Sequence, residues 1–204
     1  MMCFDCDPPR IELLRHELDS AHSIHTGMLP TELLLPDLEF EQLWNEHPQE
    51  SAKIKMVGKL IPMPRFQQAY EFDYLFSQPP SLAIPAPLLL RRYLNWIREY
   101  LDDRLNGLLV NWYDGPSHYI GPHSDETEQL IPGSPIVTLS FGEPRVFRLS
   151  HGRGDDRRVY DLPTAQGLII LIPWETNLVW KHSVPKSIKY QGRRISVTAR
   201  AFQS

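Results

Sequence analysis

Short β-rich segments separated by turn residues fill the second half of the chain, and this pattern most limits the folds available to it. The segments are Leu108–Trp112, Ile136–Phe141, Val146–Leu149, Arg158–Leu162, Gly167–Ile172 and Ile195–Ala201. Strands so short and so closely spaced are typical of a sandwich or a jelly roll. The chain also has 19 prolines in 204 residues, well above the usual share of about 5%. Frequent proline favours turns and argues against a helical bundle.

Less regular patterns precede these strands. Ile11–Leu18 and Leu38–Trp44 have apolar spacings that predict short helices. The segment Lys53–Lys59 alternates polar and apolar residues, which predicts a strand with Gly58 at its turn. The first half of the chain therefore predicts a helical layer beside a β core.

A longer helix is expected over residues 87–106. Pro87 fits its first turn, and Asn106–Gly107 fits its end. The apolar residues that recur at helical spacing are Leu90, Tyr93, Leu94, Ile97 and Leu101. This helix would support the strands that follow it.

The net charge of −4 hides an uneven distribution along the chain. Residues 1–144 are acidic, whereas residues 145–204 carry eleven Lys or Arg against four Asp or Glu. A basic segment on an acidic protein suggests a polyanion partner or an anionic cofactor, and it fits a solvated β surface equally well. Charge alone does not decide between these interpretations.

The composition predicts an intracellular, soluble chain. Met1–Arg10 has neither the basic start nor the apolar run of a secretory signal. The longest apolar stretches, such as Gly167–Pro173, are far short of the roughly 20 residues that a membrane span requires. Cys3 and Cys6 have C-x-x-C spacing without a second pair, which predicts reduced thiols in a loose terminus. We expect a monomer with no membrane contact.

His123, Asp125 and His182 have the residue types of an iron site. An imidazole and a carboxylate at positions i and i+2 of an extended strand point to one face. Two neutral nitrogens and one carboxylate on a β scaffold form the 2-His-1-carboxylate facial triad, which leaves open positions on ferrous iron for a co-substrate and for O₂. Because the chain has eight histidines, this spacing alone also fits a chance match.

Alternating polar residues near the C-terminus predict a strand that binds an anion. The residues on one face of this strand are Arg194, Ser196, Thr198 and Arg200. Two guanidiniums inside a barrel are costly to bury unpaired, and they suit a dicarboxylate held bidentately. Upstream, Asn111 and Tyr113 share a face and can donate hydrogen bonds to the same ligand. The alternative is a set of salt bridges without a ligand, for which the available partners are Asp114, Asp125 and Asp161.

Together these motifs resemble the AlkB family of iron(II)/2-oxoglutarate dioxygenases. The resemblance is carried by Asn111-x-Tyr113, His123-x-Asp125, Ser134–Pro135–Ile136, Ser140–Phe141–Gly142 with Arg145-x-Phe147, Trp180-x-His182 and Arg194-x-Ser196-x-Thr198-x-Arg200. It covers roughly residues 54–202. It implies a mostly β fold with α, in which a double-stranded β-helix (jelly-roll) core lies beside an N-terminal helical layer and a nucleotide-recognition lid.

The resemblance also implies cofactors and an activity. Fe(2+) would be bound by His123, Asp125 and His182. The co-substrate 2-oxoglutarate would be held at its 1-carboxylate end by Arg200 and Asn111, and at the other end by Arg194, Tyr113 and Ser196, with Thr198 on the same strand face. With O₂, members of the family oxidatively demethylate N-alkylated bases, such as 1-methyladenine and 3-methylcytosine, and release formaldehyde, succinate and CO₂. This reaction is a DNA repair reaction.

Upstream, the motifs Met56–Val57–Gly58–Lys59 and Tyr74-x-Phe76–Ser77 resemble the lid of the duplex-DNA repair members. The expected substrate contacts are Val57, Gly58, Arg65, Tyr74, Phe76, Thr127 and Glu128. The resemblance implies that a flipped base stacks on Phe76, opposite His123. Flipping suits the chemistry because the methyl group is inaccessible inside a duplex. The alternative is that the lid aromatics belong to the core.

These expectations divide the chain into an N-terminal extension, residues 1–52, and a single dioxygenase domain, residues 53–204. Within the domain, residues 53–80 would form the lid, residues 87–106 the supporting helix and residues 107–204 the jelly-roll core.

Three residues depart from the family pattern. Thr127 stands where an acidic residue usually contacts the base, Ser196 where asparagine is usual, and Val57 where an aromatic wedge enters the vacated stack. None of them is an iron ligand, so the departures affect the substrate. We expect nucleic acid, and DNA rather than RNA, as the partner. Two alternatives are a 2-oxoglutarate oxygenase of the same fold acting on a protein or small molecule, and a catalytically silent binding module.

Overall fold

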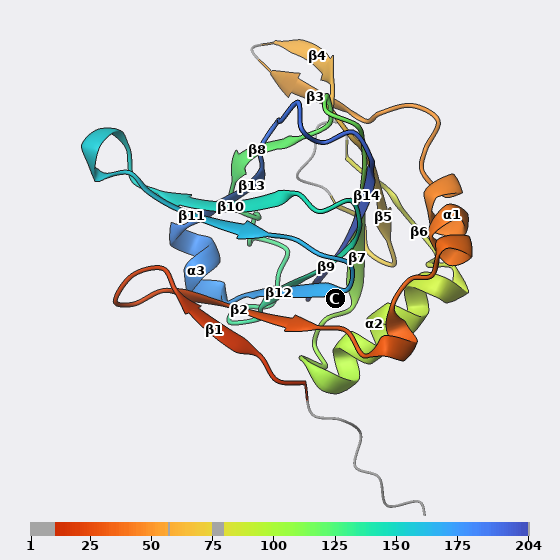
Figure 1. Cartoon of the computed structure of the whole chain (residues 1–204), viewed down its shortest axis with the longest axis horizontal. Helices are drawn as coiled ribbons and strands as arrows, with labels where there is room; N and C mark the ends of the chain where they lie inside the picture. Colours follow the sequence, from red (N-terminus) through yellow and green to blue (C-terminus); the bar gives the residue numbers. More distant parts are fainter. Residues whose placement is uncertain (1–10, 57, 75–79, 204) are drawn as a thin grey trace, which may run out of the picture.

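A computed structural model of the chain describes residues 11–56, 58–74 and 80–203, and it contains two sheets that face each other (Figure 1). The large sheet has the order β1-β2-β12-β9-β14-β7-β5-β6, and the small sheet has the order β11-β10-β13-β8. The strands of the large sheet are β1 (Leu14–Glu17), β2 (Ser23–Met28), β5 (Phe66–Tyr70), β6 (Ala83–Ile84), β7 (Gly107–Asp114), β9 (Ile136–Gly142), β12 (Leu168–Ile172) and β14 (Arg193–Arg200). Those of the small sheet are β8 (Ile120–His123), β10 (Val146–His151), β11 (Arg158–Pro163) and β13 (Lys181–Val184).

The remaining elements are a hairpin and short helices. The hairpin consists of β3 (Lys53–Met56) and β4 (Lys59–Pro62). The helices are α1 (Asp37–Asn45), α2 (Leu88–Tyr100) and α3 (Trp174–Val179), with 3-10 turns η1 (Thr31–Leu33) and η2 (Gly154–Asp156). None of the helices in the described ranges is long and apolar enough to cross a membrane. Cys3 and Cys6 lie outside the described residues.

Apolar side chains from both sheets fill one part of the space between them. Ile24, Tyr113, Ile136 and Ile170 come from the large sheet, and Phe147, Leu149, Leu162 and Val184 from the small one. Every strand predicted after residue 107 is present, with bounds that differ by a few residues. The predicted mostly β jelly-roll core is therefore confirmed.

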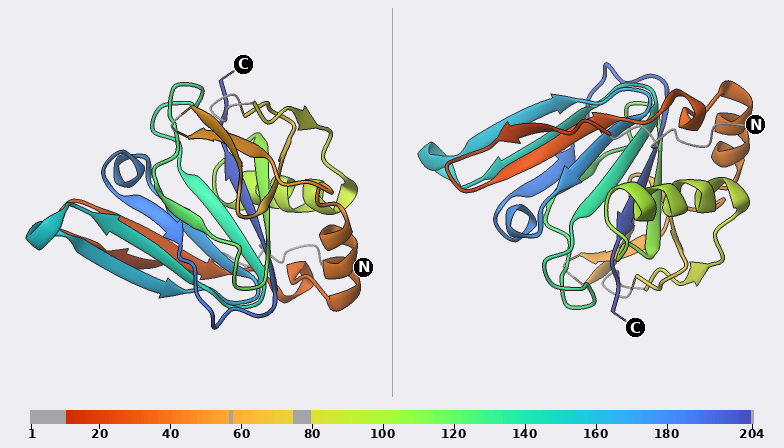
Figure 2. Two further views of the ribbon diagram at one scale, coloured as in Figure 1. Left: turned by 90° about the horizontal axis from the view of Figure 1, so that it is seen from above. Right: turned by 90° about the horizontal axis from the view of Figure 1, so that it is seen from below.

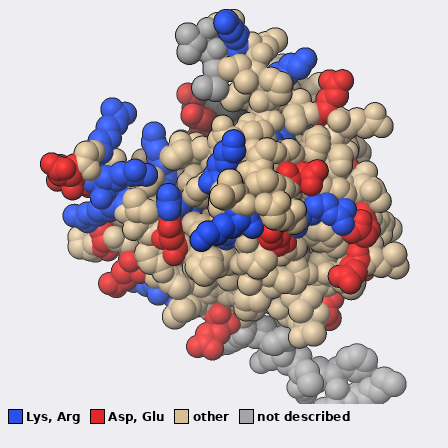
Figure 3. Space-filling view, turned by 45° about the horizontal axis from the view of Figure 1, so that its top comes forward, with Lys and Arg blue, Asp and Glu red and all other residues tan. Residues whose placement is uncertain are grey.

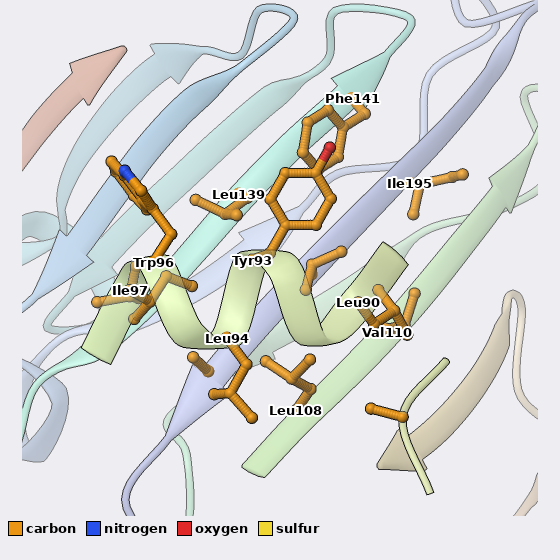
Figure 4. Packing of buried hydrophobic residues seen from close by; sticks show 14 of the residues in the cluster. Leu90, Tyr93, Leu94, Trp96, Ile97, Leu108, Val110, Leu139, Phe141 and Ile195 are labelled. Carbon is orange, nitrogen blue, oxygen red and sulfur yellow. The ribbon is translucent and has the colours of Figure 1, made fainter. Parts of the chain in front are cut away.

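Helix α2 covers the outer face of the large sheet, and Figure 2 shows it on the same side as α1. The apolar stripe that the sequence predicted faces the sheet: Leu90, Tyr93, Leu94 and Ile97 pack among Leu108, Val110, Leu139, Phe141 and Ile195 (Figure 4). Burying such side chains contributes roughly 1.5–3 kcal/mol each. The helix fixes the strands that carry the pocket residues on their other face.

The supporting helix ends at Tyr100, so the prediction that it continues to residue 106 is wrong. The Asp102 carboxylate accepts hydrogen bonds from the backbone N–H of Arg104 (3.0 Å) and from its Nε (2.9 Å), which turns the chain away from the helix axis. The backbone N–H of Asn106 then donates to the carbonyl of Arg200 (2.9 Å). Local side-chain bonds of this kind compete with helix continuation.

The N-terminal segment contradicts one prediction. Residues 14–17 form β1 rather than part of a helix over Ile11–Leu18, because they pair with β2 in register from Leu14↔Thr26 to Glu17↔Ser23. β2 in turn pairs with β12. Leu38–Trp44 is helical as predicted, within α1. The boundary expected at residue 52 stays a prediction, although β1 and β2 lie in the large sheet.

The strand predicted over Lys53–Lys59 is present as β3, which ends at Met56, and Gly58 lies in the turn that leads to β4 as predicted. Gly58 has a φ of +77°, in the left-handed region that glycine adopts without steric cost. β3 and β4 pair with each other and stand apart from both sheets at the top of Figure 1. Val57, which precedes the turn glycine, lies outside the described residues.

Replacing Gly142 with alanine is expected to destabilise the fold more than the same change at Gly133. Both glycines have positive φ, +83° and +74°, so alanine costs about 1–2 kcal/mol at either. An added Cβ at Gly142 would fall against the carbonyl oxygen of Arg193 and the ring of Phe40, whereas Gly133 has open space. We expect a loss of about 2–5 kcal/mol for Gly142→Ala. Urea unfolding measures both, and equal losses would contradict the steric account.

Candidate metal centre and co-substrate pocket

A cavity of about 550 Å³ lies between the sheets and opens beside the β3–β4 hairpin. Its walls come from β7 and β14 of the large sheet and from β8 and β13 of the small sheet. The candidate ligands for iron and for 2-oxoglutarate all line it: His123, Asp125, His182, Asn111, Tyr113, Arg194, Ser196, Thr198 and Arg200. The structure thus brings together residues that are far apart in sequence.

The two histidines come from neighbouring strands of the small sheet. His123 ends β8 and pairs directly with His182 on β13, and their ring centroids are 4.3 Å apart. Nδ1 of His123 lies 2.9 Å from the carbonyl oxygen of Gly121, to which it can donate. That bond leaves Nε2 as the nitrogen available for a metal.

Asp125 lies just after β8 and connects the two sheets. Its Oδ2 accepts a hydrogen bond from Nε of Arg200 (2.9 Å), on β14, and forms an ion pair with Nη2 of the same arginine (2.8 Å). Its Oδ1 lies 3.8 Å from Nε2 of His123 and 3.9 Å from Nε2 of His182. Oδ1 is buried and has no hydrogen-bond partner among the described residues. A buried oxygen so placed between two imidazoles fits a cation.

The protonation states of the three side chains suit a divalent metal. Burial opposes the charge on Asp125, but Arg200 and the two histidines lower its pKa to about 2. Burial, with His123 beside it, lowers the pKa of His182 to about 3. Burial also lowers the pKa of His123. At neutral pH the cluster is two neutral imidazoles and one carboxylate, all within 4.8 Å of one another, as an iron triad requires.

Two buried arginines stand at different positions along β14. Arg194 donates from Nη2 to Oγ of Ser140 (2.9 Å), while its Nε and Nη1 have no partner among the described residues. Nη1 of Arg200 is also buried without a hydrogen-bond partner among the described residues. Thr198, between the arginines, shares a 3.1 Å hydrogen bond with Thr138. Buried guanidinium groups with unused donors fit an anionic ligand.

Asn111 and Tyr113 stand beside these arginines on β7. Oδ1 of Asn111 accepts a 2.7 Å hydrogen bond from Nε of Arg65, whose Nη2 donates to Gln67 (2.9 Å). The ring of Tyr113 lies 5.1 Å from the guanidinium carbon of Arg194. Ser196 pairs with Asn111 across the strands. The buried Arg65 therefore reaches a predicted co-substrate residue as well as the cavity.

The predicted substrate contacts are only partly brought together. Arg65 and Tyr74 line the cavity, and the guanidinium carbon of Arg200 lies 5.4 Å from the Tyr74 ring centroid. Thr127 and Glu128 lie in the loop after Asp125 and do not line the cavity, and Gly58 is exposed at the hairpin turn. Val57 and Phe76 lie outside the described residues.

The sequence analysis assigned no role to Arg145 or Asn177. Both side chains form hydrogen bonds with the backbone of segments that carry the pocket. Arg145 donates to the carbonyls of His118 (2.8 Å), Gly115 (2.9 Å) and Gly192 (3.2 Å). Arg145 belongs to the motif Arg145-x-Phe147, so the sequence did mark it as part of the family pattern. Asn177 contacts the backbone of Asp125, and no spacing in the sequence pointed to that contact.

Comparison with known proteins agrees with this geometry. Residues 45–200 match the family model described as the 2OG-Fe(II) oxygenase superfamily. The chain is 30% identical over 192 residues to the human protein named DNA oxidative demethylase ALKBH2, covering 90% of this chain and 73% of that protein. It is 33% identical over 158 residues to the mouse protein of the same name, covering 73% and 66%. A bovine protein, alpha-ketoglutarate-dependent dioxygenase alkB homolog 3, is 28% identical over 176 residues, covering 80% and 60%.

A solved structure described as "The structure of OsALKBH1" has a TM-score of 0.55 to this chain at 12% identity. The match covers 92% of this chain and 99% of that one, and it supports the fold alone. The family model covers most of the chain, and the human relative is aligned over most of its length. The chain therefore belongs to the AlkB family of iron(II)/2-oxoglutarate dioxygenases, within the 2OG-Fe(II) oxygenase superfamily.

Proposed function

We propose that this protein oxidatively demethylates N-alkylated bases in nucleic acid, and in DNA rather than RNA. The observation that carries the proposal is the cluster of His123, Asp125 and His182 at the wall of a cavity that also holds two buried arginines. The relatives named DNA oxidative demethylase ALKBH2 support the choice of DNA. Demethylation of 1-methyladenine or 3-methylcytosine in DNA is the reaction to test first.

Iron would be held by Nε2 of His123, Nε2 of His182 and Oδ1 of Asp125. When bound there, ferrous iron with 2-oxoglutarate and O₂ supplies the oxidising power that removes the alkyl carbon as formaldehyde. Arg200 holds the other oxygen of Asp125, so the carboxylate presents one defined oxygen to the metal. The chain thereby fixes the orientation of the ligand before a metal arrives.

The arginines would bind the two carboxylates of 2-oxoglutarate. Arg200, with Asn111, lies near the metal cluster and would hold the 1-carboxylate end. Oδ1 of Asn111 already accepts a hydrogen bond from Arg65, and the side-chain nitrogen of Asn111 can donate to a carboxylate. Arg194, with Tyr113 and Ser196, would hold the distant carboxylate. The buried, unused donors of Arg194 support this role, since a carboxylate satisfies a guanidinium bidentately.

The mouth of the cavity would hold the flipped base. Ile54, Ile61 and Met63 contribute apolar surface there, and Tyr74 and Arg65 contribute polar groups. A flat base needs both, because it stacks on its faces and donates and accepts at its edge. The cavity of about 550 Å³ has room for a co-substrate and a base together.

The rest of the nucleic acid would lie along basic surface. Arg153, Arg157 and Arg158 are all exposed around η2, at the end of the β10–β11 hairpin. This hairpin projects from the molecule (Figure 1), and Figure 3 shows basic side chains gathered on that side together with acidic ones. Phosphate contacts by such residues supply affinity without sequence preference.

We further propose that the enzyme acts as an intracellular monomer. All candidate iron and 2-oxoglutarate residues come from one chain, which supports a site that needs no partner to complete it. Light scattering of the purified protein tests the oligomeric state, and fractionation of its host cells tests the location.

His123→Ala is expected to abolish formaldehyde release from oligonucleotides that carry 1-methyladenine or 3-methylcytosine, because it removes one of three iron ligands. Mass spectrometry of the base and a formaldehyde assay measure the result. The matched control is His151→Ala, since His151 is exposed on β10 and outside the cavity lining. Normal turnover by His123→Ala would refute the metal assignment.

Arg194→Lys is expected to raise the KM for 2-oxoglutarate about ten- to a hundredfold, because a compact ammonium cannot reproduce the planar two-donor grip. The estimate corresponds to the roughly 1.5–3 kcal/mol of a charge-assisted hydrogen bond. Succinate formation at varied 2-oxoglutarate gives the KM. Arg193→Lys serves as the control, since Arg193 is on the same strand but pairs with Glu41. An unchanged KM would make Arg194 structural.

Neutralising Arg153, Arg157 and Arg158 together, as glutamines, is expected to flatten the salt dependence of DNA binding. Each lost phosphate contact removes about 0.9 from the slope of log K against log salt for a duplex. Fluorescence anisotropy across a salt series gives the slope for both proteins. Salt-independent binding by the unaltered protein would favour the alternative, an oxygenase that acts on a protein or small molecule.

A further inference from the structure

The three candidate iron ligands differ in the backbone structure around them, since two lie on strands and one lies in a loop. His123 and His182 lie on paired strands whose ladder fixes them. Asp125 lies beyond the end of β8, in a segment without helix or strand. A ligand on a loop needs other contacts to hold it within a fraction of an ångström of its working position. The structure supplies such contacts from α3.

The side chain of Asn177 grips the backbone of Asp125 on both sides. The N–H of Asp125 donates to Oδ1 of Asn177 (2.9 Å), and Nδ2 of Asn177 donates to the carbonyl oxygen of Asp125 (2.9 Å). Asn177 is 1% exposed and Asp125 is 3% exposed. The asparagine amide thus takes the place of a neighbouring strand, since it presents one acceptor and one donor as a peptide group does.

Asn177 is itself anchored. Its own N–H donates to the carbonyl of Pro173 (3.0 Å), and Oγ1 of Thr176 donates to the carbonyl of Ser23 on β2 (2.8 Å). The chain leaves α3 at Trp180, whose carbonyl lies 3.3 Å from Oγ of Ser124, and enters β13. The segment that runs from α3 into β13 therefore forms hydrogen bonds with the backbone of Asp125 and also carries His182.

We propose that Asn177 is a positioning residue for the metal centre: through the backbone of Asp125 it holds the carboxylate against the two histidines. The inference rests on the proposed function, in which these three side chains bind iron. With the backbone held by Asn177 and Oδ2 held by Arg200, Asp125 has little freedom to turn Oδ1 away from the cluster. Partners of metal ligands of this kind typically contribute ten- to a hundredfold in metal affinity.

The test is Mn²⁺ binding by the full chain without 2-oxoglutarate or nucleic acid, measured from the electron paramagnetic resonance signal of the free ion. Asn177→Leu keeps the number and branching of the side-chain heavy atoms and removes both hydrogen bonds. Asn177→Ser leaves room for water and carries the test where the leucine variant fails to fold. Both are expected to raise the Kd for Mn²⁺ by about tenfold or more.

The matched control is Tyr93→Phe on α2, which removes a buried hydrogen bond from the Tyr93 hydroxyl to the carbonyl of Leu33 (3.1 Å), away from the cavity. Tyr93 is 0% exposed, so this change should lower the melting temperature and leave the Kd for Mn²⁺ unchanged. An unchanged Kd in both Asn177 variants would overturn the assignment, and so would equal weakening in Tyr93→Phe. Failure of the unaltered, folded protein to bind Mn²⁺ would instead refute the metal centre, and the inference would fall with it.

Discussion

The structure depends on a buried carboxylate that is shared between the two sheets. Arg200 projects from the large sheet and the two histidines from the small one, and Asp125 lies between them. Placing two charges in such a site is unfavourable unless each is paired, so the sheets are held at the spacing that satisfies both. The pKa of Asp125 is lowered to about 2 because Arg200 and the two histidines outweigh the effect of burial. The cavity exists because the sheets meet at charged groups there and at apolar groups elsewhere.

Much of the fold was predictable because its main strands are rich in apolar and β-branched residues. Ile136–Gly142 and Leu168–Ile172 are buried on both faces and read clearly in the sequence. β8 and β13 were missed because four residues that include proline, histidine and lysine carry little periodic signal. Ile11–Leu18 was misassigned because eight residues with apolar positions three or four apart fit a helix, and pairing with β2 decided otherwise.

The candidate site shows the same limit. The types and spacing of His123 and Asp125 predicted a metal cluster, since the chemistry of iron demands those atoms. The contacts that shape the cluster could not be predicted. Arg65 reaches Asn111 from 46 positions away, and Asn177 reaches Asp125 from 52 positions away. Amide and guanidinium groups suit many partners, so only the folded arrangement selects one.

The pairing of β2 with β12 has a practical consequence for anyone who trims this protein. The family match begins at residue 45, which invites a shortened chain without the first two strands. Such a fragment would present the side of β12 that β2 covers at Leu168–Leu171 as an open edge of apolar residues. Unpaired edges of this kind template association between molecules. It would also lose Ser23, the backbone acceptor that anchors α3. Aggregation of a truncated preparation would then reflect the cut, and would say nothing about the enzyme.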